Sequence, residues 1–171
     1  MSLYKNKYRI ETTRLANWDY GTNAPYFITI CAKDRQHFFG KIENQEMYLN
    51  DTGNIVVKEW LKTPEIRPDM NITLDEFIVM PNHFHGIICI GDNQYNTTPA
   101  ISKFGIQSKN LASIIRGFKS SVTRQVKFFN PDFSWQERFY DNIIKNENDW
   151  HLIRNYIINN PANWQQDKFH S

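Results

Sequence analysis

The chain has 171 residues, a formal net charge of +2 and 40% hydrophobic residues, which is typical of one globular domain with a substantial core. Its two cysteines, Cys31 and Cys89, lie in apolar runs without a CxxC spacing, so we expect reduced, buried thiols and no disulfide framework. No window approaches the roughly 18 consecutive apolar residues of a membrane helix, and the first residues lack an apolar leader, so we expect a soluble intracellular domain over residues 1–171 with no membrane partner.

A polar and aromatic arm, residues 1–23, precedes the first regular element. Its aromatic residues can stack on unpaired bases or pack on the sheet, and both readings stay open: Tyr4, Tyr8, Trp18 and Tyr20. Residues 24–33, rich in β-branched and aromatic side chains, are typical of a buried strand. Residues 37–50 indicate a hairpin that turns at "ENQE".

The middle of the chain predicts one helix and a pair of strands. Cap-type residues followed by helical spacing predict a helix from about residue 51 to 62, before two prolines. Residues 71–80 and 83–91 then predict two antiparallel strands joined at Pro81-Asn82. The polar segment 92–109 has no clear period and is long for a loop, so we expect a mobile or DNA-binding loop.

The last third of the chain is basic and contains two more helices. Apolar residues at helical spacing predict an amphipathic helix over residues 110–127, and "FSWQERFYDNIIKN", residues 133–146, predicts the last strand. A final helix follows and stops at Pro161. The order of elements predicts an α+β fold, a ferredoxin-like antiparallel sheet with helices packed on one face.

Basic residues are concentrated on and before the amphipathic helix. Residues 1–100 carry 10 basic and 12 acidic side chains, whereas residues 101–171 carry 10 and 6. The stretch from Lys103 to Lys127 contains six basic residues and no acidic one. It is a candidate phosphate-binding surface or a solvated helix face. The candidate DNA-binding residues are Lys103, Lys109, Arg116, Lys119, Arg124 and Lys127.

The run "HFHG" places His83 and His85 two residues apart in an otherwise apolar strand. Alternate residues of a strand share a face, so the two imidazoles point to the same side and Phe84 points to the other. The Cα atoms of His83 and His85 are then about 7 Å apart. Two imidazoles on one face can share a metal ion, although a pair alone supplies too few ligands to define a site.

The final helix adds a phenol and an amide. Tyr156 and Asn160 are four residues apart and therefore neighbours on one face of that helix. An amide oxygen is a suitable ligand for a hard cation, and a tyrosine hydroxyl is a candidate nucleophile toward a phosphate. Taken alone, Tyr156 is equally an ordinary half-buried helix residue.

Three runs, "VMPNHFHGIICI", "IIRGFKSSVTRQV" and "WQERFYDNIIKNENDWHLIRNYIINNP", occur together in this order. In these runs the chain resembles the single-tyrosine HUH transposases, in particular the branch of REP-associated tyrosine transposases, over roughly residues 24–164. The resemblance implies that His83 and His85 bind the metal and that Tyr156 is the nucleophile. It also implies a ligand role for Asn160. Many relatives carry a histidine where this chain has Asn142.

By the same resemblance, the activity is metal-dependent cleavage and rejoining of single-stranded or hairpin DNA through a 5′-phosphotyrosine, with magnesium or manganese as cofactor. The resemblance also implies a bacterial cytoplasmic protein that associates with the nucleoid. A monomer and a homodimer both stay open, because some relatives exchange the tyrosine helix between subunits. Tyr140 is a rival nucleophile that we interpret as structural.

Two other functions stay open at this point. The chain can be a domesticated DNA hairpin-binding protein that has lost cleavage. It can also be a metal-dependent phosphoesterase with water as the nucleophile, although the sequence has no second HxT or HxS motif. Formation of a covalent adduct with DNA distinguishes a transposase from a hairpin-binding protein. Turnover of small phosphodiesters distinguishes a phosphoesterase from both.

Overall fold

The computed structural model describes residues 18–97 and 108–171, together with residue 15 and the short stretches 3–4 and 7–8. The two short stretches pair as β1 (Leu3–Tyr4) and β2 (Lys7–Tyr8). Lys103 and the side chains of Tyr4 and Tyr8 lie outside the described residues, so their roles in DNA binding stay predictions. Among the described helices, none has the length and hydrophobicity of a transmembrane span.

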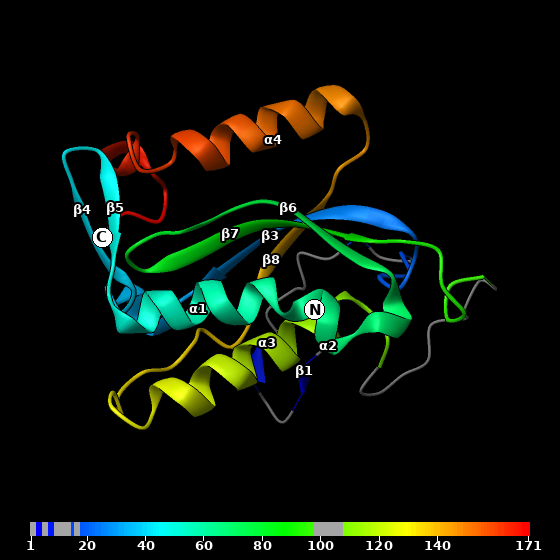
Figure 1. The fold of residues 1–171 in the computed structure, drawn as a ribbon, viewed down its shortest axis with the longest axis horizontal. Helices are drawn as coiled ribbons and strands as arrows, with labels where there is room; N and C mark the ends of the chain where they lie inside the picture. Colours follow the sequence, from blue (N-terminus) through cyan, green and yellow to red (C-terminus); the bar gives the residue numbers. More distant parts are fainter. Residues whose placement is uncertain (1–2, 5–6, 9–14, 16–17, 98–107) are drawn as a thin grey trace.

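A four-stranded antiparallel sheet forms the centre of the structure (Figure 1). Its spatial order is β6-β7-β3-β8, made of β3 (Ala24–Cys31), β6 (Ile72–Val79), β7 (His83–Ile90) and β8 (Tyr140–Ile143). Helix α1 (Asp51–Leu61) lies between β3 and β6 in the chain, and α3 (Leu111–Val126) lies between β7 and β8. This order of strands and helices is the ferredoxin-like one, so the expected α+β class is confirmed.

The helices lie on both faces of the sheet (Figure 1). The sequence predicts helices on one face, and α1 and α3 share that face with the short α2 (Thr63–Ile66) beside them. Helix α4 (Glu147–Asn159) differs from this expectation, because it covers the opposite face. The reason lies in β7, which is apolar on both faces: Phe84 and Ile88 belong to the core under α1 and α3, and Ile87 belongs to the cluster under α4. A strand of this kind needs cover on both sides.

An asparagine begins each of the three long helices. The side chains of Asn50, Asn110 and Asn146 each accept a hydrogen bond from the backbone N–H three residues later. Such caps satisfy an N–H group that would otherwise lack an intrahelical partner. They place the helix starts within one residue of the positions that the sequence indicates.

Smaller elements connect the layers. The expected hairpin is β4 (Gly40–Glu43) and β5 (Glu46–Leu49), joined at Asn44-Gln45, which both have positive φ, 50° and 66°. This is the primed turn that suits the twist of a two-residue hairpin. Single turns of 3-10 helix complete the chain at Lys33–Arg35, Pro68–Met70 and Trp164–Gln166.

The last strand is shorter than the sequence suggests. The ladder covers Tyr140–Ile143, and Trp135 makes only an isolated bridge to Ala32. Phe133 and Trp135 are both buried in the core under α1 and α3, although their segment has no ladder of its own. The ammonium of Lys119 also binds two carbonyl oxygens of this segment, at Gln136 and Glu137, which removes them from strand pairing.

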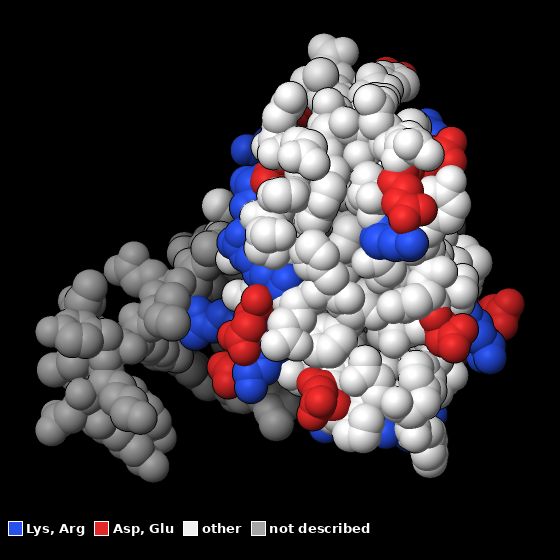
Figure 2. All heavy atoms as spheres, turned by 90° about the vertical axis from the view of Figure 1, so that its left-hand side faces the viewer, with Lys and Arg blue, Asp and Glu red and all other residues white. Residues whose placement is uncertain are grey.

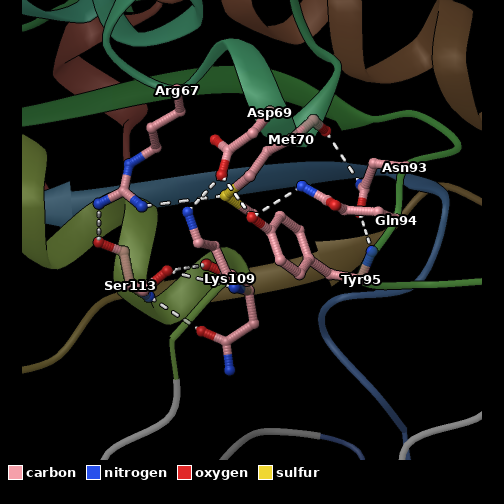
Figure 3. A network of polar contacts seen from close by, with 9 residues as sticks. Arg67, Asp69, Met70, Asn93, Gln94, Tyr95, Lys109 and Ser113 are labelled. Carbon is pink, nitrogen blue, oxygen red and sulfur yellow. Dashed lines mark hydrogen bonds and ion pairs between the residues drawn. The ribbon is translucent and has the colours of Figure 1, made fainter.

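The described ends of segment 92–109 meet at one carboxylate (Figure 3). The hydroxyl of Tyr95 donates to Asp69 Oδ2 at 2.8 Å, and the Lys109 ammonium pairs with the same oxygen while it lies 4.9 Å from the centre of the Tyr95 ring. Nearby, Arg67 donates to the carbonyl oxygen of Ser113 in the first turn of α3. Asp69 therefore fixes where this segment leaves and rejoins the fold, and residues 98–107 lie outside the described part.

Candidate active site

His83 and His85 lie side by side on the face of β7 that α4 covers. Their ring centroids are 4.5 Å apart, and neither side chain is exposed to solvent. Phe84 between them points to the other face, where it packs on Trp60 of α1. The alternation of the strand thus brings both imidazoles to one place.

Asn82 fixes the tautomer of His83. The Asn82 amide nitrogen donates to the carbonyl oxygens of Phe169 (2.9 Å) and Arg35 (3.2 Å), so its Oδ1 must act as the acceptor for His83 Nδ1, 2.8 Å away. His83 therefore carries its proton on Nδ1 and has a lone pair on Nε2. That Nε2 atom is buried without a hydrogen-bond partner among the described residues.

His85 is held from two sides. Its Nδ1 lies 2.7 Å from the hydroxyl of Thr29, its cross-strand partner on β3, and its Nε2 lies 3.2 Å from the hydroxyl of Tyr156 on α4. Phe27 stacks on its ring at 5.4 Å between centroids. Groups that bind the far nitrogen of an imidazole orient it for metal binding, and Thr29 and Asn82 occupy these positions here.

A carboxylate that sequence reasoning missed completes the site. The Tyr156 hydroxyl donates to Asp167 Oδ2 at 3.2 Å, and the Asn160 amide donates to the same oxygen at 2.8 Å. Potential ligand atoms of His83, His85 and Asp167 all lie within 4.8 Å of one another. Asp167 comes from the C-terminal segment, residues 161–171, which returns to the sheet after α4.

The donor set fits a divalent metal ion. Of the buried polar atoms that lack hydrogen-bond partners among the described residues, two belong to this site, His83 Nε2 and Asn160 Oδ1, and both are ligand-type lone-pair donors. Imidazole nitrogens and carboxylate or amide oxygens are ligands that divalent metal ions accept. The structure thus places Asn160 beside the histidines and adds Asp167 to the expected ligands.

Burial controls the protonation of these groups. It lowers the pKa of His83 to about 4, against the opposing charge of Asp167, and it lowers the pKa of His85 well below its usual value, with further help from His83. Both imidazoles are therefore neutral at pH 7. Burial, together with the charge and the hydrogen bond of Asp167, raises the pKa of Tyr156 to about 12, so its phenol is protonated.

The C-terminal segment covers the histidines. Phe169 is 4% exposed, and its ring centroid lies 4.9 Å from that of His83 and 5.7 Å from that of His85. Trp164 stacks on His83 at 6.0 Å. At the end of the molecule that carries the β4–β5 hairpin and the C-terminus, Figure 2 shows a largely uncharged surface with scattered charged side chains.

Comparison with known proteins places the chain in a family. A scan of protein-family models finds no match. An uncharacterised protein of Haemophilus influenzae (strain ATCC 51907 / DSM 11121 / KW20 / Rd) is 39% identical over 167 residues, which cover 92% of this chain and 91% of that protein. The chain belongs to the same family as this protein.

A solved structure resembles the fold. It is a REP-associated tyrosine transposase bound to a REP hairpin, with a TM-score of 0.61 and 19% sequence identity over 91% of this chain and 77% of that one. The chain has the fold of this transposase, which confirms at the level of the fold the resemblance noted in its sequence.

The predicted DNA-binding residues do not gather at the tyrosine. Helix α3, with Arg116, Lys119 and Arg124, and its C-cap residue Lys127 lie on the face of the sheet opposite α4 (Figure 1). Lys109 is paired with Asp69, and Lys119 holds the segment before β8. Arg124 lines a pocket of about 300 Å³ between α3 and α1–α2. Basic contacts from this helix are therefore remote from the histidines.

The remaining predicted residues have definite places. Trp18 donates from its indole to the Tyr26 hydroxyl at 3.2 Å, and Tyr20 is buried and stacked on Tyr26, so both pack on the fold. Tyr140, 43% exposed, contacts Phe169 at 5.9 Å between ring centroids. Asn142 is exposed two residues further along β8.

Proposed function

We propose that this protein is a DNA strand transesterase that cleaves and rejoins single-stranded or hairpin DNA through a covalent bond to Tyr156. The observation that carries the proposal is the position of the Tyr156 hydroxyl, 3.2 Å from His85 Nε2 and 3.2 Å from Asp167 Oδ2. A nucleophile beside an acceptor carboxylate and potential metal ligands is the arrangement that phosphoryl transfer to a side chain needs. The hairpin bound to the transposase of the same fold supports hairpin DNA as the substrate.

In the proposed reaction, the Tyr156 oxygen forms a bond to the scissile phosphorus and the bond from phosphorus to the 3′ oxygen breaks. The phenol proton passes to Asp167 Oδ2, which already accepts its hydrogen bond. The leaving 3′ oxygen takes a proton from water, which gives a free 3′ hydroxyl and a 5′-phosphotyrosine. Attack by another 3′ hydroxyl reverses these steps and joins new ends.

The ligand atoms of His83, His85, Asp167 and Asn160 are the proposed metal site. A bound magnesium or manganese ion would offset the charge of Asp167, favour ionisation of the phenol and stabilise negative charge on the phosphate. Asn82 and Thr29 hold the two imidazoles in orientation. His85 Nε2 accepts only one partner, so a metal ion held at this atom would take the place of the Tyr156 hydroxyl.

A second function has one observation in its favour. Phe169 and Trp164 bury the imidazoles, so in the described arrangement a phosphate cannot reach His83 or His85. A hairpin-binding protein without cleavage would retain this cover permanently. Cleavage requires the C-terminal segment beyond Asp167 to move aside.

Adduct formation with DNA tests the proposal. Single-stranded substrate with a hairpin, labelled and incubated with magnesium or manganese, is expected to give an SDS-resistant protein–DNA adduct. Tyr156→Phe removes one oxygen and is expected to abolish the adduct, whereas Tyr140→Phe, the matched control, is expected to retain it. An adduct that persists in Tyr156→Phe or maps to Tyr140 contradicts the assignment, and hairpin binding without any adduct favours the second function.

A further inference from the structure

Helix α4, which carries Tyr156, is attached to the edge strand β6 at a position where the strand register shifts. The register between β6 and β7 shifts between Leu74 and Phe77, so Asp75 and Glu76 lie in a β-bulge. Neighbouring residues of a regular strand point to opposite faces, whereas a bulge can direct both toward the same element. Here both carboxylates reach α4.

Three contacts join the bulge to two residues of α4. The Trp150 indole donates to Asp75 Oδ2, and Arg154 Nε lies 3.4 Å from Asp75 Oδ1. Arg154 also donates from a terminal nitrogen to Glu76 Oε1 at 3.0 Å. Trp150 and Arg154 are one helical turn apart, so they attach the helix along one line of its surface.

Apolar packing alone leaves the rotation of α4 weakly defined. The cluster between α4 and the sheet has three buried members, and five partly buried side chains pack against it. The buried ones are Ile87, Ile144 and Ile157, and the partly buried ones are Phe27, Ile78, Cys89, Trp150 and Ile153. Hydrophobic contact has no preferred direction, whereas hydrogen bonds weaken steeply when their geometry changes. The polar contacts at the bulge are partly exposed, so they contribute little net stability, and their effect is on orientation.

A small rotation of this helix displaces the nucleophile. A helix with its side chains is about 10–12 Å wide, so an atom about 6 Å from the axis moves by about 2 Å for a rotation of about 20°. The Tyr156 hydroxyl is only 3.2 Å from His85 Nε2 and from Asp167 Oδ2. Such a rotation removes one or both contacts.

We propose that Asp75, Glu76, Trp150 and Arg154 form a latch that sets the rotation of α4 and thereby positions Tyr156 for attack on DNA. These are positioning residues, since none of them contacts the reacting atoms. The inference rests on the proposed function for its catalytic consequence. Its structural part, the link between Arg154 and the phenol–imidazole contact, is measurable without DNA.

The catalytic test compares variants of Arg154 with a control on the same helix. Arg154→Ala and Arg154→Lys are expected to lower kcat for adduct formation by about 10- to 100-fold, because a displacement of about 1 Å can cost that much. The KM and the hairpin affinity are expected to stay within about twofold. His151→Ala, at an exposed residue of α4, is the matched control and is expected to retain the wild-type kcat.

A charge exchange separates orientation from general destabilisation. Glu76→Lys is expected to lower kcat like Arg154→Ala. Glu76→Lys combined with Arg154→Glu restores an ion pair between the bulge and α4 but sets the new carboxylate against Asp75, so it is expected to recover only part of the loss. Measurements at a temperature where every variant is folded exclude simple unfolding. An unchanged kcat in Arg154→Ala and in Glu76→Lys, or a loss confined to KM, would overturn the proposal.

A readout without DNA keeps the two proposals distinguishable. In protein labelled at the histidine ring nitrogens, Tyr156→Phe is expected to shift the His85 resonances by removing the phenol contact. Arg154→Ala is expected to shift them in the same direction, and His151→Ala is expected to leave them unchanged. If wild-type protein forms no adduct but these shifts occur, the proposed function fails and the latch stands. Unshifted His85 resonances in Arg154→Ala sink the latch even if wild-type protein cleaves DNA.

Discussion

The hydroxyl of Tyr156 lies 3.2 Å from Nε2 of His85, although the two residues are 71 positions apart in the chain. Helix α4 lies over the face of the sheet that carries His85. The contact uses the nitrogen atom that a metal ion would need. Metal binding at this nitrogen and the phenol–imidazole contact would therefore exclude one another.

Asp167→Asn is expected to weaken manganese binding by about 10- to 100-fold, because it replaces a charged oxygen ligand with a neutral amide. Tyr156→Phe is expected to bind manganese at least as tightly as wild-type protein, since His85 Nε2 loses its competing partner. Calorimetric titration of the apoprotein with manganese measures both effects. Asp132→Asn, at an exposed residue, is the control, and equal affinity of wild-type and Asp167→Asn protein would remove Asp167 from the ligand set.

Stability without metal is expected to fall as the pH is lowered from about 6.5 to about 4. The unfolded chain takes up a proton at His83 near pH 6.5, whereas burial lowers the folded pKa of His83 to about 4, so protonation favours the unfolded state in this window. The slope is up to about 1.4 kcal/mol per pH unit for each such histidine. Urea unfolding at several pH values measures it.

The control for this pH dependence is His151, whose side chain is 64% exposed. His83→Asn is expected to reduce the slope of the stability curve between pH 4 and pH 6.5 and to leave the part that comes from His85, whereas His151→Asn is expected to leave the slope unchanged. Equal slopes in wild-type and His83→Asn protein would show that His83 is not buried in its neutral form.

Phe169→Ala is expected to raise the rate of adduct formation. Removing the ring uncovers His83 and His85, and if the covered form holds about 90% of the molecules, the rate increases about 10-fold. Loss of a buried phenylalanine can cost about 3–5 kcal/mol, so Phe169→Leu serves as a milder second variant. Phe128→Ala, at a residue that is 87% exposed, is the control. Rates equal to wild type in both Phe169 variants would show that the cover does not limit access.

Arg116→Ala and Arg124→Ala are each expected to reduce the slope of log affinity against log salt by about 0.7 for single-stranded DNA, or about 0.9 for a duplex stem. Lys119→Ala is expected to lower the melting temperature as well, because its ammonium holds the carbonyl groups of Gln136 and Glu137. Binding assays at several salt concentrations measure the slopes. Lys41→Ala, which breaks only a surface pair with Glu43, is the control, and unchanged slopes for Arg116 and Arg124 would place DNA elsewhere.

Much of the fold follows from local sequence signals. Asparagine caps at Asn50, Asn110 and Asn146 mark the helix starts, and the alternation in β7 puts His83 and His85 on one face. These features depend on residues close together in the chain. They can therefore be predicted from the sequence alone.

The rest depends on contacts between distant residues. Asp167 has no spacing relation to the histidines, and only the return of the C-terminal segment to the sheet brings it to them. Lys119 matches the pattern of a solvated basic helix, yet its amine binds backbone oxygens 17 and 18 residues later. Helix α4 covers the face of the sheet that α1 and α3 leave open. The sequence of α4 itself does not indicate on which face of the sheet it packs.

The candidate site combines residues of a central strand, β7, with residues of a peripheral segment, and the two differ in rigidity. β7 is paired on both sides, by β6 and β3, and its side chains fill the hydrophobic clusters on both faces of the sheet. A strand in this position opens only when the whole domain unfolds, whereas a peripheral segment can detach at a much lower free energy. We therefore expect the imidazoles to belong to the most persistent part of the molecule. The C-terminal segment with Asp167 and Phe169 is expected to detach while the sheet stays intact. Access to the histidines can change without any loss of their arrangement.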